Sequence, residues 1–485
     1  MSVTFNYRIG GSWVAGKSAK AVEDYCPADQ GRLLARFNLL NADQVRQAVD
    51  AAVAGAASWR AVSPVTRAAV LSKAAQILRQ QQPELAEIIA LENGKTLAEA
   101  SVEVQKSAEF LEFYAATGRL PQGGMIADAR AGTRAMAMVE PVGIVVMITP
   151  WNDPMLTPAR KLGPALISGN SVILKPARDT PLAALLIVRA LVEAGLPDGV
   201  LNLIITDHEV FDQEVLARPE LAAVTFTGST AVGLELGRKL AGRNVRLQTE
   251  MGGKNASVVL ADADLDMAAT TIAAAAFGQA GQRCTATSRV LVQQQVHDVF
   301  LDKLLAAAAR FVPGPSTAAG TCLGPLVSRR QQQEVLAHIV GARDAGAQIL
   351  CGGVAPVDKG MDKGCFVLPT VIAGVTENMS IWRDEVFGPV LAVMSTASFD
   401  EALRAVNDSS YGLSAALFTN DLRCTQRFVE AVDTGQVSVN LPTSGWDVHQ
   451  PFGGFKESGS AFKEQGLEGL RFYTRTKMAA IRYDW

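Results

Sequence analysis

The sequence predicts an α/β protein built from two doubly wound units with parallel sheets. From Glu140 onward, short runs rich in β-branched residues alternate with amphipathic helical stretches, and this alternation is typical of parallel sheets. A second alternating region runs from about Asp262 to about Phe452. With 485 residues, the chain is also too long for one ordinary hydrophobic core. Since ligands of such sheets bind beyond the carboxyl ends of the strands, functional residues are expected there.

The individual elements follow from local patterns along the chain. A short hairpin-like segment comes first, and helical regions are predicted at 41–79 and 83–118, where Ala, Val and Leu recur at helical spacing. Strands are then predicted at 142–148, 171–174, 200–205 and 222–226, with helices between them at 158–167, 182–194 and 231–241. The segments 119–138 and 470–481 alternate apolar and polar residues without a helix to pair with, which predicts a small separate β element.

Composition excludes several classes of protein. Hydrophobic residues make up 48% and charged residues 19%, so a large buried interior is expected and disorder is not. The net charge of −3 shows no basic excess for nucleic-acid binding. No signal peptide or membrane-spanning run is indicated, and a cytoplasmic protein is expected. The six cysteines and four histidines lack metal-ligand spacing, so free thiols and no metal site are expected.

Three segments carry residue types that a covalent reaction needs. Cys284 lies in the glycine-bracketed stretch Phe277-Gly-Gln-Ala-Gly-Gln-Arg-Cys-Thr285, whose small residues let a substrate approach the thiol. Glu250, in Leu247-Gln-Thr-Glu-Met-Gly-Gly-Lys254, is a candidate base at a predicted strand end. Asn152 stands in Ile148-Thr-Pro-Trp-Asn-Asp-Pro154. Taken singly, the cysteine reads as a small buried residue and the asparagine as a turn residue.

Taken together and in this order, the three segments resemble the aldehyde dehydrogenase superfamily. The resemblance runs from Arg8-Ile-Gly-Gly-Ser-Trp13 to Pro451-Phe-Gly-Gly-Phe-Lys456. It implies an aldehyde dehydrogenase-like fold with a Rossmann-like NAD(P)-binding domain at 1–118 and 140–253 and a catalytic domain at 254–455. The remaining segments, 119–139 and 465–485, are implied to form a small β element for oligomerisation, and a homodimer or homotetramer is expected.

The resemblance also implies roles for the three residues. Cys284 as thiolate attacks the carbonyl carbon of an aldehyde, and the Asn152 side-chain amide and the Cys284 backbone N–H stabilise the resulting oxyanion. A hydride then leaves for a nicotinamide, which gives a thioester. Glu250 activates the water that releases the carboxylic acid.

The implied cofactor is NAD or NADP. Gly228 and Ser229 lie at a strand-to-helix junction, where the amides of a helix N-terminus can meet a pyrophosphate. Lys175 ends a strand and is placed for a ribose or phosphate contact, while Glu385 and Phe387 match the pair that holds the nicotinamide ribose and ring. The complete expected set is Thr149, Pro150, Trp151, Lys175, Arg178, Gly228, Ser229, Gly233, Gly252, Glu385 and Phe387.

Two departures from the family pattern bear on the choice between the cofactors. Arg178 stands where a glutamate usually holds the adenosine ribose hydroxyls, and a guanidinium can pair with a 2′-phosphate that a carboxylate repels. The loop Thr206-Asp-His-Glu209 replaces the usual glycine-rich turn. The sequence leaves NAD versus NADP open.

For the substrate, Gly281–Arg289 and Val439–Gly454 resemble the branch that acts on α-ketoglutaric semialdehyde. Arg160, Arg283 and Trp446 are the expected substrate-binding residues, and Arg160 follows Asn152 by about two helical turns. Arg160 can instead face solvent or a carboxylate between domains. Succinate-type and aromatic aldehydes are alternative substrates. A coenzyme-A-acylating enzyme or a non-catalytic homologue is a further alternative, against which the presence of Glu250 and of the thiol argues.

Overall fold

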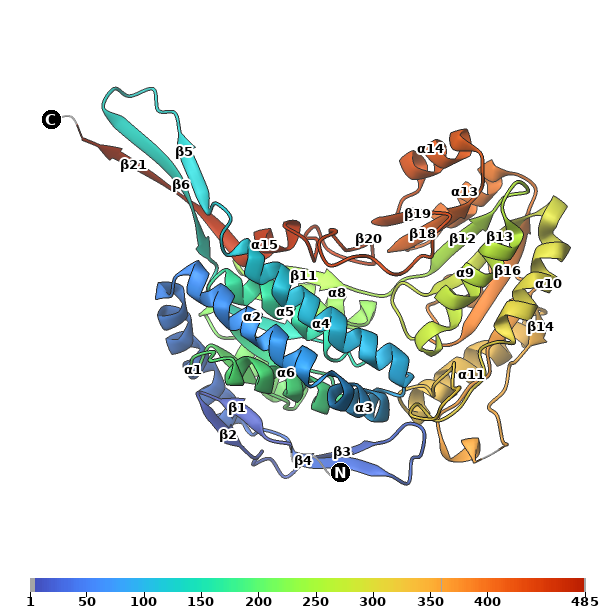
Figure 1. Cartoon of the computed structure of the whole chain (residues 1–485), viewed down its shortest axis with the longest axis horizontal. Coiled ribbons are helices and arrows are strands. Elements are labelled where there is room, and N and C mark those ends of the chain that lie inside the picture. Colours follow the sequence, from blue (N-terminus) through green and yellow to red (C-terminus); the bar gives the residue numbers. More distant parts are fainter. Residues whose placement is uncertain (1–4, 359, 484–485) are drawn as a thin grey trace.

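The computed structural model describes residues 5–358 and 360–483. Residues 1–4, 359 and 484–485, which belong to the expected domain ranges, lie outside this description. Two α/β halves lie side by side, and a narrow β arm extends from one of them (Figure 1). Each half has its own cluster of buried hydrophobic residues. The boundaries between a cofactor-binding and a catalytic domain stay predictions.

The first sheet contains five parallel strands in the order β11-β10-β7-β8-β9. Their bounds are β7 (Ile144–Ile148), β8 (Ser171–Lys175), β9 (Leu201–Leu203), β10 (Leu221–Thr227) and β11 (Arg246–Glu250). The central strands β7 and β8 are almost continuously apolar because helices cover parallel sheets. Since β8 and β10 flank β7 on opposite sides, the strand order reverses at β7, and a crevice is expected beyond its carboxyl end.

The helices of this half are α1 (Ala42–Ala61), α2 (Pro64–Gln80), α3 (Gln82–Asn93), α4 (Leu97–Thr117), α5 (Leu156–Ile167), α6 (Pro181–Glu193), α7 (His208–Phe211) with a π-helical turn at Asp212–Leu216, and α8 (Thr230–Leu240). Each of the two long regions predicted as helical is divided into two helices. Ser63 caps α2 and Pro64 opens it, because a proline at the first position sacrifices no helical hydrogen bond. Gly94, with a φ of 95°, ends α3.

The second sheet contains seven strands in the order β14-β15-β16-β13-β12-β18-β19. All neighbours are parallel except β14 and β15, which are antiparallel. The strands are β12 (Asn255–Val259), β13 (Thr287–Gln293), β14 (Gln348–Cys351), β15 (Thr370–Ala373), β16 (Val390–Thr396), β18 (Ser414–Phe418) and β19 (Gln436–Val439). The helices are α9 (Leu265–Phe277), α10 (His297–Ala308), α11 (Arg329–Asp344), α12 (Ser380–Arg383), α13 (Phe399–Asn407) and α14 (Leu422–Ala431), with short 3₁₀ turns at Gly278–Gly281, Gln294–Val296 and Met361–Lys363.

The arm is a three-stranded antiparallel sheet in the order β21-β6-β5 (Figure 1). It joins β5 (Gly123–Ile126) and β6 (Thr133–Pro141) to β21 (Thr474–Arg482) from the end of the chain. The expectation that the tail is extended from residue 470 was wrong for its first residues, because α15 (Glu468–Tyr473) continues to Tyr473 and buries Phe472 and Tyr473. The arm exposes the apolar side chains of Met125, Ile126, Met138, Met478 and Ile481.

Smaller β elements complete the fold. The N-terminal hairpins are β1 (Tyr7–Ile9) with β2 (Ser12–Val14) and β3 (Ala21–Tyr25) with β4 (Leu33–Asn38), and β17 (Tyr411–Gly412) pairs with β20 (Phe455–Lys456). In the part of the chain that the structure covers, no helix combines the length and the apolar character that crossing a membrane requires.

One close backbone contact fixes α1 on the first sheet. A Cβ atom added at Gly55 would lie 2.4 Å from the carbonyl carbon of Gly199, just before β9, and backbone atoms there cannot move aside easily. Gly341, inside α11, has no atom within 4 Å of the same added position. The packing of α1 therefore requires a glycine at position 55, whereas a larger residue has room at position 341.

Replacing each of these glycines by alanine should change stability in opposite directions. Gly55→Ala forces α1 away from the sheet and should lower the free energy of unfolding by about 1–3 kcal/mol. Gly341→Ala should raise it by about 0.4–1 kcal/mol, because alanine reduces the entropy of the unfolded chain. Thermal unfolding followed by circular dichroism measures both. A shift of the same sign for the two variants would contradict the packing described for Gly55.

Candidate active site

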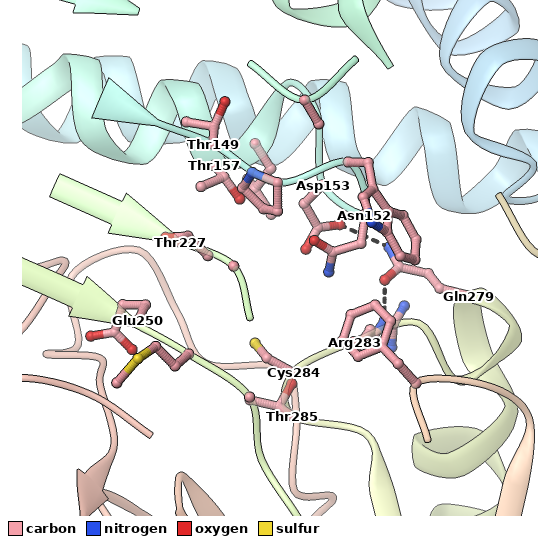
Figure 2. Close-up of a pocket in the computed structure, with 18 of the residues that line it drawn as sticks. Thr149, Asn152, Asp153, Thr157, Thr227, Glu250, Gln279, Arg283, Cys284 and Thr285 are labelled. Carbon is pink, nitrogen blue, oxygen red and sulfur yellow. Dashed lines mark hydrogen bonds between the residues drawn. The ribbon is translucent and has the colours of Figure 1, made fainter. Parts of the chain in front are cut away.

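A cavity of about 1050 Å³ opens beyond the carboxyl ends of the first-sheet strands and reaches the second half of the molecule. Sixteen of the seventeen predicted site residues line it, which are Thr149, Pro150, Trp151, Asn152, Arg160, Lys175, Arg178, Gly228, Ser229, Glu250, Gly252, Arg283, Cys284, Glu385, Phe387 and Trp446. The cavity thus brings together residues that lie far apart in the sequence, and Figure 2 shows its central part.

Cys284 follows a strained turn that aims the thiol into the cavity. Gln279 and Ala280 adopt left-handed backbone conformations, with φ of 51° and 54°. Gly281 has a φ of 69°, and an added Cβ would lie 2.1 Å from the Gly388 carbonyl oxygen, so only glycine fits. Burial raises the pKa of the Cys284 thiol to about 12, while the nearby Arg160 guanidinium acts in the opposite direction.

Asn152 is buried and lies in an irregular turn before α5. Its Nδ2 atom donates a hydrogen bond of 3.0 Å to the carbonyl oxygen of Gln282, two residues before the nucleophile. The expectation that two helical turns separate Asn152 from Arg160 was wrong, because α5 begins only at Leu156. In Figure 2, the Cys284 sulfur points into the space between Asn152 and Glu250.

Glu250 ends β11 and is buried. Its two carboxyl oxygens have no hydrogen-bond partner among the residues that the structure describes. Burial, together with the charge of Glu464, raises the pKa of Glu250 well above its ordinary value, whereas Arg160 and Lys161 lower it. Burial therefore opposes the ionised carboxylate, which is the form that can act as a base, and the two cations favour it.

Sequence reasoning missed the ion-pair group of Arg160, Lys161 and Glu464, whose charges act on Glu250. Glu464 Oε2 lies 2.8 Å from Arg160 Nε, and Glu464 Oε1 pairs with the buried Lys161 Nζ. Lys161 also donates to Thr225 Oγ1 at 2.7 Å. Arg160 therefore pairs with a carboxylate, which was one of the alternatives to substrate binding. Its side chain nevertheless lines the cavity. A lysine followed directly by the apolar run Leu162–Ile167 was the available signal for a buried partner.

A second group missed from the sequence supports the turn that carries Asn152. Lys95 Nζ lies 2.5 Å from Glu103 Oε2 and 3.0 Å from Asp153 Oδ1, and the lysine and Glu103 are both almost fully buried. Gln279 Nε2 donates to the same Asp153 oxygen at 3.2 Å. Arg283 Nε then donates to Gln279 Oε1 at 2.6 Å, so this expected substrate residue is engaged with the nucleophile turn (Figure 2).

Glycines and one carboxyl shape the part of the cavity near Phe387. A Cβ added at Gly252 would lie 2.2 Å from Glu385 Oε2, so glycine is needed for the carboxyl to reach this position. Glu385 Oε1 accepts the Gly253 N–H at 2.8 Å, and burial raises the Glu385 pKa to about 7. The Phe387 ring packs edge-on against Trp151, with 5.3 Å between the ring centres.

The other end of the cavity is lined by Lys175 at the end of β8, by Arg178 and by the start of α8 at Gly228 and Ser229. Gly233 is the predicted site residue that does not line the cavity. It lies inside α8, where an added Cβ would meet the Met251 sulfur at 2.4 Å, and close helix packing therefore explains this glycine. Within the described ranges, no group of three or more His, Cys, Asp or Glu side chains could hold a metal ion.

Comparison with known families gives a match to the aldehyde dehydrogenase family over residues 13–479. The chain belongs to the aldehyde dehydrogenase family. Among the relatives of this aldehyde dehydrogenase are a 2,5-dioxopentanoate dehydrogenase of Saccharolobus solfataricus and an alpha-ketoglutarate semialdehyde dehydrogenase of Haloferax volcanii. The first is 38% identical over 97% of this chain and 98% of the relative, and the second is 39% identical over 99% of both.

Solved structures agree with the family and with the fold. Betaine aldehyde dehydrogenase of Staphylococcus aureus in complex with NAD⁺ superposes with a TM-score of 0.95 at 30% identity, covering 98% of this chain and 94% of that one. The expected fold, an aldehyde dehydrogenase-like arrangement of two α/β halves with a small β element, is therefore confirmed.

The raised pKa of Cys284 makes a prediction for this aldehyde dehydrogenase. Because the thiolate is the reactive form and its pKa is about 12, alkylation of Cys284 by iodoacetamide should accelerate about tenfold per pH unit between pH 7 and 9. Arg160→Leu removes the charge that favours the thiolate and should slow the reaction. Peptide mass spectrometry measures each cysteine separately, with the exposed Cys322 as internal control. A plateau in the Cys284 rate below pH 9 would contradict the assigned pKa.

Proposed function

We propose that this aldehyde dehydrogenase oxidises an aldehyde to a carboxylic acid with NAD or NADP, through a thiohemiacetal and a thioester on Cys284. The presence of Cys284, Asn152 and Glu250 in the lining of one cavity is the observation that carries this proposal. A nucleophile, an oxyanion donor and a base are the groups that acyl transfer through a covalent intermediate requires.

In the first step, the Cys284 sulfur bonds to the carbonyl carbon and the carbonyl oxygen becomes an oxyanion. The Asn152 amide nitrogen carries two hydrogens. One hydrogen forms the hydrogen bond to the Gln282 carbonyl oxygen, which orients the amide. The other hydrogen can then face the oxyanion. The Cys284 backbone N–H is the second proposed donor. Arg160 assists the thiol, because its positive charge favours the thiolate.

The cofactor, when bound, supplies the acceptor for the hydride that leaves the thiohemiacetal carbon. The residues at both ends of the cavity fit such a group. Gly228 and Ser229 at the start of α8 offer backbone amides to a pyrophosphate, and Lys175 offers an ammonium group. Glu385 is placed for a ribose hydroxyl and Phe387 for the nicotinamide ring, and Thr149, Pro150, Trp151, Arg178 and Gly252 complete the proposed lining.

Glu250 acts in the last step, the hydrolysis of the thioester. As a carboxylate, Glu250 removes a proton from water, the resulting hydroxide attacks the thioester carbon, and the Cys284 thiolate leaves. The positive charges of Arg160 and Lys161 favour the ionised carboxyl, against the effect of burial. This role for Glu250 argues against a reaction that transfers the acyl group to coenzyme A.

For the substrate, we propose a carboxylated semialdehyde such as α-ketoglutaric semialdehyde. The names of the two relatives and the position of Arg160 in the cavity support this class. Arg160 has five N–H donors, of which its contacts with Glu464 and with Gln465 use only part, so a substrate carboxylate can take others. Arg283 and Trp446 line the same cavity and are the other proposed substrate contacts.

We also propose a homodimer or homotetramer in the cytoplasm. The β arm exposes apolar side chains on a narrow extension, and such a surface is stabilised when a neighbouring subunit covers it. All six cysteines are free thiols, as expected in a reducing compartment.

Glu250→Gln should separate hydride transfer from hydrolysis. A single burst of reduced cofactor, close to one per active site, should precede a slow steady state, because only thioester hydrolysis needs activated water. Stopped-flow absorbance of the reduced nicotinamide measures the burst. Cys284→Ala is the control and should retain less than about a hundredth of wild-type turnover, with no burst. Loss of the burst in Glu250→Gln would place Glu250 in an earlier step.

Arg160→Leu should reduce kcat/KM for α-ketoglutaric semialdehyde by about 10- to 150-fold, the equivalent of a charge-assisted contact of about 1.5–3 kcal/mol. An uncharged aldehyde of equal length controls for structural effects, since Arg160 also pairs with Glu464. This control substrate should lose much less. Equal losses on both substrates would show that Arg160 acts through Cys284 or Glu464 and does not bind the substrate.

A further inference from the structure

Three basic side chains gather at the end of the cavity away from Cys284. They are Lys175 at the end of β8, Arg178 in the loop that follows, and His208 at the first position of α7. All three line the cavity. His208 was not among the expected site residues, because the loop after β9 departs from the family pattern at this place.

Among the residues that the structure describes, no acidic side chain forms an ion pair with the Lys175 ammonium group. Its Nζ atom lies 5.4 Å from the centre of the Phe211 ring. Burial, and after it the positive charge of Arg178, lowers the Lys175 pKa to about 8, with Asp212 acting weakly in the opposite direction. An anion bound beside Lys175 would remove this unfavourable charge interaction.

Arg178 is held in place by the loop that carries His208. Its Nη2 atom donates to the Thr206 carbonyl oxygen at 2.8 Å and lies 3.5 Å from Asp207 Oδ1. Asp207 is shared with Lys20, whose Nζ is 3.1 Å from Oδ2, and Asp207 does not line the cavity. The guanidinium is therefore held through its Nη2 atom, and the Arg178 side chain remains 39% exposed. A fixed, planar guanidinium is the arrangement that binds phosphate in two-pronged fashion.

His208 completes the group. Burial and the charges of Lys175 and Arg178 lower its pKa, Asp212 raises it, and Lys239 of α8 lowers it slightly. Glu235, also on α8, interacts with His208 as well. A bound dianion would favour the protonated imidazole, which then offers a third positive charge.

We propose that Lys175, Arg178 and His208 bind the 2′-phosphate of NADP, so that NADP is the preferred cofactor of this enzyme. The proposal rests on the proposed function, since it assigns the adenosine end of the cofactor to this part of the cavity. An NAD-specific site would instead present a carboxylate to the ribose hydroxyls. Asp179 lines the cavity next to Arg178, but burial raises its pKa and Arg330 is its main opposing charge.

Calorimetric binding of 2′,5′-ADP and of 5′-ADP to the full-length enzyme at pH 7.5 tests this proposal without the reaction. The wild-type enzyme should bind 2′,5′-ADP about tenfold or more tightly than 5′-ADP. Arg178→Ala and His208→Gln should each reduce this ratio by several-fold and leave 5′-ADP binding nearly unchanged. Arg238→Gln, which removes an exposed charge on α8 away from the cavity, is the matched control and should keep the wild-type ratio.

The outcomes separate the two proposals. Equal affinity of the wild-type enzyme for the two ligands would overturn the 2′-phosphate site and leave the proposed function intact. Binding of neither ligand would overturn both. A reduced ratio in Arg238→Gln equal to that in Arg178→Ala would show a general charge effect and overturn the assignment to these residues.

Proton uptake distinguishes a direct role of His208 from a structural one. At pH 7.5, binding of 2′,5′-ADP in buffers of different ionisation enthalpy should take up protons, because the phosphate favours protonated His208 and Lys175. His208→Gln should show smaller uptake than wild type. Equal uptake by the two proteins would overturn the role of His208.

Discussion

The active site depends on a group of buried ion pairs around Lys95, which one hydrogen bond links to the turn of the nucleophile. Lys95, between α3 and α4, lies between Glu103 and Asp153, and Glu103 also accepts the Met155 and Leu156 N–H groups at the start of α5. Asp153 in turn accepts a hydrogen bond from Gln279, in the turn before Cys284. Since a buried charge without a partner is strongly unfavourable, these contacts have few alternative arrangements. They hold the turn of Asn152 against the turn of the nucleophile.

Burial governs the chemistry of the cavity as well as its shape. The low-dielectric surroundings that raise the pKa of Cys284 and of Glu250 oppose the ionised forms that the proposed reaction needs. Arg160 favours ionisation of both groups, and Lys161 favours that of Glu250. Glu464 pairs with both of these cations and places them beside the site. Arg160 thus combines an electrostatic role with its proposed role in substrate binding.

The departures from the family pattern gather at the adenosine end of the cavity. Arg178 and the loop Thr206-Asp-His-Glu209 contact each other through the Thr206 carbonyl oxygen, so two differences in sequence form one structural feature. Cys284, Glu250 and Asn152 stand in segments that follow the family pattern. The reaction constrains the residue types around the thiol. At the adenosine end, the required charge depends on whether the cofactor carries a 2′-phosphate.

Local features of the protein could be predicted from the sequence better than long-range contacts. Alternating apolar patterns located β7, β8 and β10 within a few residues, because buried parallel strands have a distinct composition. The predicted helices at 41–79 and 83–118 are each two helices in the structure. Pro64 and Gly94 were signals in the sequence for these breaks. The motif order identified Cys284, Glu250 and Asn152 as candidates, and the cavity contains all three.

The sequence by itself determined the fold class, the family and the identity of the candidate nucleophile, base and amide, because these follow from local pattern and from motifs. Only the tertiary structure decided which charges meet. The pairing of Arg160 with Glu464, the support of Asp153 by Lys95, and the gathering of Lys175, Arg178 and His208 join residues from separate elements. The physical reason is that electrostatic contacts and pKa values depend on distance and burial in space, which spacing along the chain does not specify.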